Sequence, residues 1–197
     1  MPLISALHRS LHLLNRSPSE SQDLQITSPQ SETLPHSSYS IHRVPSSENS
    51  SQNRHVIKFN EDVTDGDQSK WPSQEQTVST HLVQGKHDWY EVLRENEGRF
   101  KKLLETVGDE LAQRLGLIEE GDEPEYWILG KLPKHYIFTL HHTETASGQA
   151  RLDACIFGSR ATLKFRNADE IVPHLYWLLV NTSDNVVKCE CKYCVLK

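Results

Sequence analysis

Hydrophobic positions change their spacing along the chain, and each spacing predicts a different element. From Asp88 onward, apolar side chains recur every three or four residues, as on one face of a helix. Asp88 and the glutamate three residues later have the spacing of a capping box, and Gly116 is well placed to end the helix. The pattern predicts one long amphipathic helix, or two consecutive ones, over residues 88–115, because Gly98 and Gly108 weaken it.

Short runs of aromatic and β-branched residues predict strands on both sides of this helix. Strands are expected at residues 55–59, 126–129 and 136–140, and a β-hairpin at residues 152–157 and 161–165. A last helix is expected after Asn167, which can cap it. Since Pro173 cannot donate a backbone hydrogen bond, a short turn is expected before it and the main helix after it. The order of elements indicates an α+β fold, a small mixed domain of helices and antiparallel strands.

The start of the chain has a different composition. Residues 1–51 contain fourteen serines, five prolines and a single aromatic residue. Such a segment buries too little apolar surface to offset the entropy lost on ordering. The sequence therefore predicts a disordered Ser/Pro-rich tail over residues 1–54 and a folded domain over residues 55–197. The leucines and two arginines of the first sixteen residues also fit a mitochondrial transit peptide, which is the less favoured interpretation.

Overall composition narrows the class of protein. Hydrophobic residues make up 36% of the chain, which is low for a fully globular protein and agrees with an unfolded tail. The formal net charge is −6, so non-specific attraction to the phosphates of nucleic acid is not the default expectation. No run of residues approaches the roughly 18 apolar positions of a membrane span.

Three of the four cysteines, Cys189, Cys191 and Cys194, lie close together near the end of the sequence. This spacing does not resemble a secreted disulfide framework, whereas three thiolates can converge on one metal ion. Zinc is the expected ion, because it binds thiolate readily and takes four ligands in a tetrahedral array. The fourth ligand is expected among His174, Cys155, His135, His141 and His142, and His174 is chosen. A reduced cluster without metal and a redox role remain open.

Catalysis finds little support in the sequence. Three thiolates make zinc a poor activator of water, so the metal is expected to be structural. The chain contains no H-x-E motif beside its cysteines, no G-x-S-x-G and no phosphate-binding loop. His141 and His142 would point to opposite faces of a strand and cannot share a pocket. Arg160, Lys164 and Arg166 alternate along the predicted hairpin and are the candidate nucleic-acid contacts, with a solvated surface as the competing interpretation.

Several stretches resemble the fungal cryptic loci regulator two family. They are YWILGKLPKHY, LDACIFGS, KFRNADEIVPHLYWLL and the final CECKYC, and the resemblance covers roughly residues 57–197. The chain departs from the family pattern at Ser159–Arg160, where a His-Pro pair is usual, and at Ile171, where Phe is usual. Members of the family carry further domains downstream, and functions located in those domains are not carried over to this chain.

The resemblance implies a nuclear protein that silences transcription within a complex pairing a histone deacetylase with a chromatin remodeller. We therefore expect a non-enzymatic scaffold or interaction module of heterochromatin, stabilised by zinc and contacting subunits of that complex. A DNA-binding or nucleosome-binding module that uses the basic hairpin is the alternative. A small zinc enzyme is the third interpretation.

Overall fold

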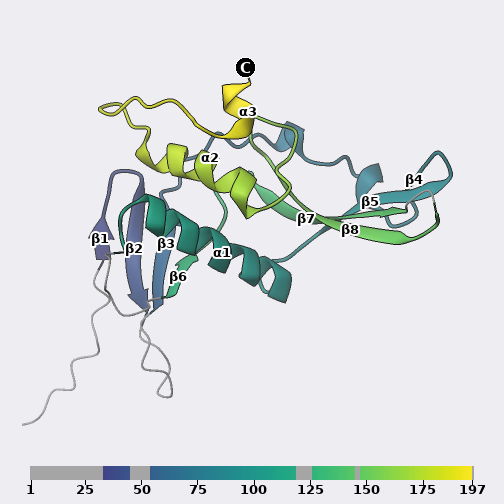
Figure 1. The fold of residues 1–197 in the computed structure, drawn as a ribbon, viewed down its shortest axis with the longest axis horizontal. Coiled ribbons are helices and arrows are strands. Elements are labelled where there is room, and N and C mark those ends of the chain that lie inside the picture. The colour runs from purple at the N-terminus through teal and green to yellow at the C-terminus, as the bar shows by residue number, and fades with distance from the viewer. Residues whose placement is uncertain (1–32, 45–53, 119–125, 145–146, 197) are drawn as a thin grey trace, which may run out of the picture. The chain divides into compact units, whose positions relative to one another are not determined.

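The computed structural model describes residues 33–44, 54–118, 126–144 and 147–196 (Figure 1). These residues form helices and mostly antiparallel strands, so the α+β class expected from the sequence is confirmed. The targeting helix considered for residues 1–16 lies outside the described residues. The same holds for the disorder expected of residues 1–32 and 45–53.

The first sheet has the strand order β1-β2-β3-β6. Its strands are β1 (Thr33–Pro35), β2 (Tyr39–Val44), β3 (Arg54–Phe59) and β6 (Tyr126–Leu129). The predicted strands at 55–59 and 126–129 are confirmed, and they pair in parallel. β1 and β2 fall within the segment assigned to the tail, so the folded part of the chain starts before residue 55. The hydrophobic pattern that would predict a strand is weak in β2, because Ile41 is its one buried residue.

The second sheet is antiparallel and has the order β4-β5-β7-β8. Its strands are β4 (Leu82–Val83), β5 (Lys86–Val92), β7 (Ile137–Glu144) and β8 (Ala150–Phe157). The predicted hairpin is wrong in its pairing, because β8 pairs along its length with β7 and residues 161–165 do not form a strand. Phe165 alone reaches β8, through two backbone hydrogen bonds to Ile156 of 2.8 and 2.9 Å.

The start of the predicted long helix is also wrong, since β5 occupies residues 86–92. Trp89 of β5 stacks on His142 of β7, with ring centroids 3.9 Å apart, and such cross-strand aromatic pairs stabilise sheets. Asp88, the expected helix cap, instead accepts a hydrogen bond of 2.9 Å from His141. The contacts that alternate residues of β5 make with β7 therefore outweigh the helical spacing of the apolar residues in this stretch.

The helix itself, α1 (Gly98–Arg114), is a single element, and Gly116 follows its C-cap Leu115 as the predicted stop. Gly116 adopts a positive φ of 68°, which favours glycine after a helix. Gly108, which was expected to weaken the helix, allows it to lie directly on β6. A Cβ atom at this position would come within 2.4 Å of the backbone of Ile128.

Replacing Gly108 with alanine is expected to lower the free energy of unfolding by about 1–3 kcal/mol, because the helix must move away from β6. Gly98 is the matched control, since a Cβ atom there has no neighbour within 4 Å. Gly98→Ala should leave stability unchanged or raise it slightly, because alanine loses less backbone entropy on folding. Urea denaturation of the two variants measures the difference, and equal effects would contradict the close packing.

The last long helix, α2 (Ala168–Val180), runs without interruption through Pro173, contrary to the predicted break. Asn167 caps it as predicted, and its side-chain oxygen accepts a 3.0 Å hydrogen bond from the backbone of Glu170. The missing N–H of Pro173 costs about 3 kcal/mol in a helix interior. Burial offsets this cost, because seven residues of α2 are buried in the domain.

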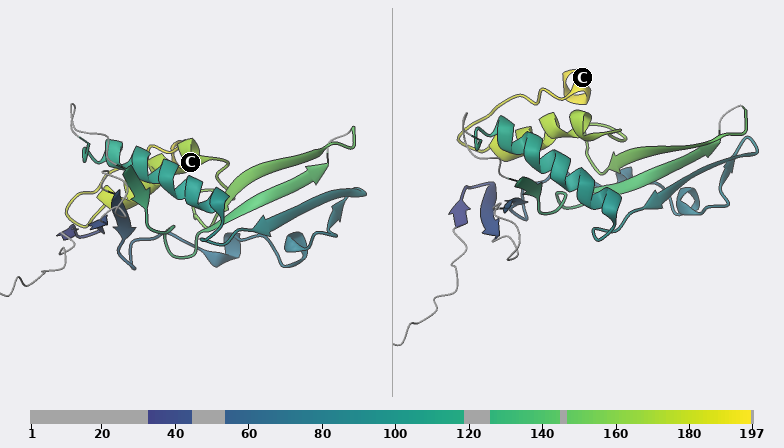
Figure 2. Two further views of the ribbon diagram at one scale, coloured as in Figure 1. Left: turned by 90° about the horizontal axis from the view of Figure 1, so that it is seen from below. Right: turned by 60° about the horizontal axis from the view of Figure 1, so that its bottom comes forward.

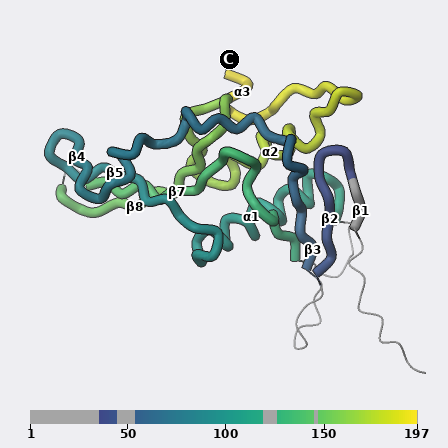
Figure 3. The backbone as a smooth tube through the Cα atoms, turned by 180° about the vertical axis from the view of Figure 1, so that it is seen from behind, coloured from purple at the N-terminus to yellow at the C-terminus, as the bar shows by residue number. Residues whose placement is uncertain are grey.

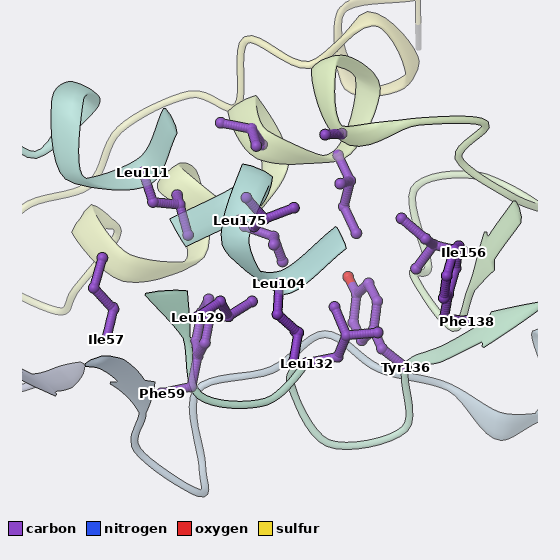
Figure 4. Close-up of a cluster of buried hydrophobic side chains, with 14 of the residues drawn as sticks. Ile57, Phe59, Leu104, Leu111, Leu129, Leu132, Tyr136, Phe138, Ile156 and Leu175 are labelled. Atoms are coloured by element: carbon purple, nitrogen blue, oxygen red, sulfur yellow. The ribbon is translucent and has the colours of Figure 1, made fainter. Parts of the chain in front are cut away.

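Both helices and both sheets contribute to one hydrophobic core (Figure 4). Leu104 and Leu111 reach it from α1 and Leu175 from α2, while Ile57 and Phe138 reach it from the two sheets. The 3-10 helices η1 (Gln68–Lys70) and η2 (Glu75–Thr77) lie in the connection between the sheets. Among the described helices, none combines the length and apolar character that a membrane crossing requires.

After α2 the chain turns back and ends in the short helix α3 (Lys192–Val195), which lies beside the first half of α2 (Figure 3). Side-chain hydrogen bonds from two aromatic residues help to hold this segment in place. Trp177 donates a hydrogen bond of 2.9 Å from its indole nitrogen to the carbonyl of Val187. Tyr193 donates one of 2.8 Å to Glu170. The returning segment is thereby brought against the face of α2 that carries His174.

Candidate metal centre

His174 of α2 and the three clustered cysteines meet where the returning segment contacts the helix. The Nδ1 atom of His174 lies 3.4 Å from the sulfur of Cys189 and 3.7 Å from the sulfurs of Cys191 and Cys194. All four ligand atoms lie within 4.8 Å of one another. His174 and Cys191 are buried, and the other two cysteines are half-buried. Residues of α2 and of the returning segment thus present one nitrogen and three sulfurs to a single point.

The spacing of these atoms fits a tetrahedral metal ion. Zinc–sulfur bonds of about 2.3 Å and zinc–nitrogen bonds of about 2.0–2.1 Å place the ligand atoms roughly 3.6 Å apart at the tetrahedral angle. The nitrogen–sulfur distances of 3.4 and 3.7 Å span that value. The four residues can therefore hold a metal ion without large movement.

The other candidates for a fourth ligand lie elsewhere. Cys155 is buried in β8, on the groove that Lys164 also lines. His141 bonds to Asp88, as described above, and His142 lies 2.9 Å from a carboxylate oxygen of Glu91. Their rings stack on different residues of β5, Tyr90 and Trp89, which alternate between the faces of the sheet. The expectation that these histidines point to opposite faces agrees with this geometry.

The opposite side of the His174 ring contacts a carboxylate that the sequence analysis did not identify. The Nε2 atom of His174 lies 3.2 Å from an oxygen of Asp65 and 3.1 Å from the hydroxyl of Ser159. A proton on Nε2 leaves the lone pair of Nδ1 directed at the three sulfurs. Histidine ligands of metals commonly have such a carboxylate partner, which fixes the tautomer and the ring orientation.

Asp65 is itself held by several donors. Tyr136 and Ser159 donate hydroxyl hydrogen bonds to its carboxylate, and the backbone N–H of Arg160 donates a third. Burial opposes ionisation of Asp65, but the hydrogen bonds from His174, Tyr136 and Ser159 lower its pKa below the ordinary value. Burial and the nearby Asp65 raise the pKa of Tyr136, so the phenol remains a donor. A carboxylate anion therefore faces His174.

Two glycines make this arrangement possible. The loop that carries Asp65 lies against the turn before Tyr136, and a Cβ atom on Gly66 would approach the carbonyl oxygen of Lys134 to 2.1 Å. Gly158 has a φ of 125°, and a Cβ atom there would approach the carbonyl oxygen of His135 to 2.2 Å. Only glycine fits such close backbone contacts.

The sequence offered little that could have revealed Asp65. In the sequence, an aspartate followed by glycine, as at Asp65–Gly66, predicts only a tight turn. The contact with His174 joins residues 109 positions apart. No local pattern reports such a contact, so only the folded structure identifies this partner.

The pKa values of the Cys189 and Cys191 thiols are shifted in opposite directions. Burial opposes ionisation of Cys191, but hydrogen bonds to the Cys194 backbone and to the two neighbouring thiols, with the nearby His174, lower its pKa. Burial, with hydrogen bonds to the other two thiols, raises the pKa of Cys189. A metal ion that binds the three sulfurs must therefore displace protons from the cluster.

The three basic residues predicted to contact nucleic acid do not form one row, because the hairpin that would align them is absent. Lys164 and Arg166 line a groove of about 430 Å³ beside β8, and Arg160 is not among its lining residues. The amino group of Lys164 is bonded to the hydroxyl of Tyr90 at 3.0 Å. Arg160 lies instead next to the metal centre, where its backbone contacts Asp65.

The part of the chain that contains the His/Cys cluster matches a known protein family. Residues 127–194 match the family described as transcription-silencing protein, cryptic loci regulator Clr2. This segment, called the Clr2-type segment, is thus similar to that family. The resemblance proposed from the sequence is confirmed over these residues. The Clr2-type segment contains all four residues of the His/Cys cluster, whereas Asp65 lies outside it.

A solved structure described as Clr2 bound to the Clr1 C-terminus is similar to 66% of this chain, with a TM-score of 0.45 and 21% sequence identity. The similar region makes up 29% of that chain, so the present chain spans less than a third of its length. No curated protein matches the chain.

Proposed function

We propose that this chain is a non-catalytic interaction module of a transcription-silencing complex and that a structural zinc ion stabilises it. The observation that carries the proposal is the cluster of His174, Cys189, Cys191 and Cys194 inside the Clr2-type segment. The family description supplies the silencing role, and the cluster supplies the means of stabilising the domain.

Zinc is proposed because of the chemistry of the ligands. Three sulfurs and one imidazole nitrogen form a Cys3His set, which is typical of structural zinc sites. The ion would join α2 to the segment that returns along it and would add to the hydrogen bonds of Trp177 and Tyr193. Within that segment, α3 has no buried residue. Metal binding would then contribute directly to the free energy of folding.

The same ligand set argues against catalysis. Catalytic zinc sites keep one coordination position open for water or substrate, whereas four protein ligands close a tetrahedral site. The sulfurs also reduce the ability of the ion to acidify water. The module would therefore act by binding other proteins and not by a reaction at the metal.

The proposed partners are subunits of a nuclear complex that pairs a histone deacetylase with a chromatin remodeller, as the resemblance implies. In this assignment the chain acts in the nucleus and helps to hold the complex at silent chromatin. Trp127 is 6% exposed and belongs to the core. The preceding residue, Tyr126, is 57% exposed, so a partner can contact it.

A tethering experiment tests the function. The full chain is fused to a sequence-specific DNA-binding domain and recruited to a reporter gene in fungal cells. We expect reporter transcription to fall at least fivefold, together with histone acetylation at the promoter. Cys191→Ser should abolish the effect, whereas Cys155→Ala should retain it, because Cys155 lies outside the cluster.

Two outcomes would contradict the proposal. Unchanged transcription with a well-expressed, metal-loaded fusion would exclude the silencing role. Silencing that survives Cys191→Ser at equal protein level would separate the function from the metal centre.

A further inference from the structure

The outer edge of β8 is an open strand edge. β8 ends the order β4-β5-β7-β8, and it lies along the outside of this sheet (Figure 2). The two backbone hydrogen bonds between Ile156 and Phe165 show which residues of β8 direct their polar groups outward. By strand alternation, Leu152 and Ala154 direct theirs outward too. Among the described residues, Phe165 is the one that pairs with this edge through its backbone.

One face of the sheet beside this edge is basic. Arg151 and Asp153 point to it and form an ion pair of 2.7 Å, so their charges cancel. Lys164 and Arg166 line the same groove from the segment that follows β8, and His141 lines it from β7. The groove therefore carries an excess of positive charge directly beside the open edge.

The other face beside the edge is apolar. Leu152 and Ala154 point to it and line a groove of about 360 Å³ between α1 and the sheet, together with Leu103, Phe138 and Leu140. Leu152 is 41% exposed although it borders this apolar groove. Arg99 and Lys102 of α1 also line this groove. The two grooves thus lie on opposite faces of one strand.

We infer that the outer edge of β8 binds an extended segment of a partner protein in which apolar and acidic side chains alternate. Such a segment would continue the sheet by backbone hydrogen bonds to Leu152 and Ala154. Since successive side chains of a strand point to opposite faces, the apolar ones would enter the groove beside α1. The acidic ones would face Lys164 and Arg166. This inference rests on the proposed interaction function and specifies where a partner binds.

Two other occupants fit the observations less well. A nucleic acid would use Lys164 and Arg166 but neither the open backbone edge nor the apolar groove, and Asp153 lies within its path. A second copy of the chain, added edge to edge along β8, would place the Arg151 and Asp153 pairs against each other and would bring little negative charge to Lys164 and Arg166.

The test uses the full chain and fluorescein-labelled heptapeptides measured by fluorescence polarisation. The peptide Glu-Val-Glu-Val-Glu-Val-Glu should bind at least tenfold more tightly than the same residues grouped as Val-Val-Val-Glu-Glu-Glu-Glu. It should also bind at least tenfold more tightly than the lysine analogue of the alternating peptide. Arg166→Glu should weaken binding at least fivefold, while Lys101→Glu, an exposed charge change outside both grooves, should not.

Methylation of the peptide backbone tests strand pairing without altering the protein. In an added strand, the N–H groups of alternate residues face β8 and the others face solvent. N-methyl groups on one alternate set should abolish binding, and those on the other set should be tolerated. Equal effects of the two sets would overturn the inference, as would equal binding of the grouped peptide.

The remaining occupants give distinct results. A 20-base-pair DNA duplex that binds the chain and loses affinity on Arg166→Glu, with no binding of the alternating peptide, would overturn the inference in favour of nucleic acid. A dimer in sedimentation equilibrium that dissociates on Leu152→Pro would overturn it in favour of a second copy. Neither result would affect the tethering experiment on Cys191, so failure of this docking site and failure of the proposed function can be distinguished.

Discussion

If the His/Cys cluster holds zinc as proposed, a chelator is expected to lower the free energy of unfolding of the chain by about 4 kcal/mol or more. That loss corresponds to a ligand held at roughly 1,000 times its dissociation constant. The physical reason is that three buried or half-buried sulfurs and His174 would lose their common partner. Thermal unfolding followed by circular dichroism, with and without chelator, measures the effect, and elemental analysis should find one zinc per chain.

Two cysteine variants test whether the chelator acts through the His/Cys cluster. Cys191→Ser should reproduce the destabilisation and remove the response to chelator, because Cys191 is fully buried in the cluster. Cys155→Ala is the control, since Cys155 is equally buried but lies on β8. A chain that contains no metal and melts identically with and without chelator would refute the structural zinc ion.

The second large effect is expected at Asp65, which supports His174 from the side opposite the sulfurs. Asp65→Asn should weaken zinc binding about 10- to 100-fold, the range found when the outer partners of metal ligands are removed. The amide cannot supply the negative charge that stabilises the His174 Nε2 proton and its hydrogen bond. Competition with a chromophoric chelator gives the affinity.

Asp67→Asn is the matched control, because it removes the same charge two positions away. The Asp67 carboxylate accepts a hydrogen bond from the backbone of Ser69 and does not contact His174. Its substitution should leave zinc affinity within about twofold of the original. Equal zinc affinity in the Asp65 and Asp67 variants would show that Asp65 has no role at the metal.

Elements with a strong local signal were predicted correctly. The strand at residues 126–129 consists of four large apolar or aromatic residues, and Gly116 has the positive φ of a helix end. The three clustered cysteines were selected from spacing and ligand chemistry, and His174 was chosen among five candidates for the fourth ligand. The structure brings the four residues together. These features depend on few neighbours in the sequence, so the sequence is sufficient to identify them.

Elements that depend on a distant partner were missed. Residues 88–92 were assigned to the predicted helix but belong to β5, because Trp89 and Tyr90 stack on histidines of β7. The predicted break at Pro173 does not occur, since burial of α2 offsets the lost hydrogen bond. In both cases tertiary contacts outweigh a local preference of a few kcal/mol.

By itself, the sequence determined the α+β class, the resemblance to a silencing family and the three thiols able to bind a metal. Those properties follow from residue type and short-range spacing. Only the tertiary structure decided that Asp65 supports His174, that Lys164 and Arg166 share a groove without Arg160, and that β8 has an open edge between two chemically different grooves. Each of these depends on chain segments that are far apart in sequence and meet only because the core brings them together.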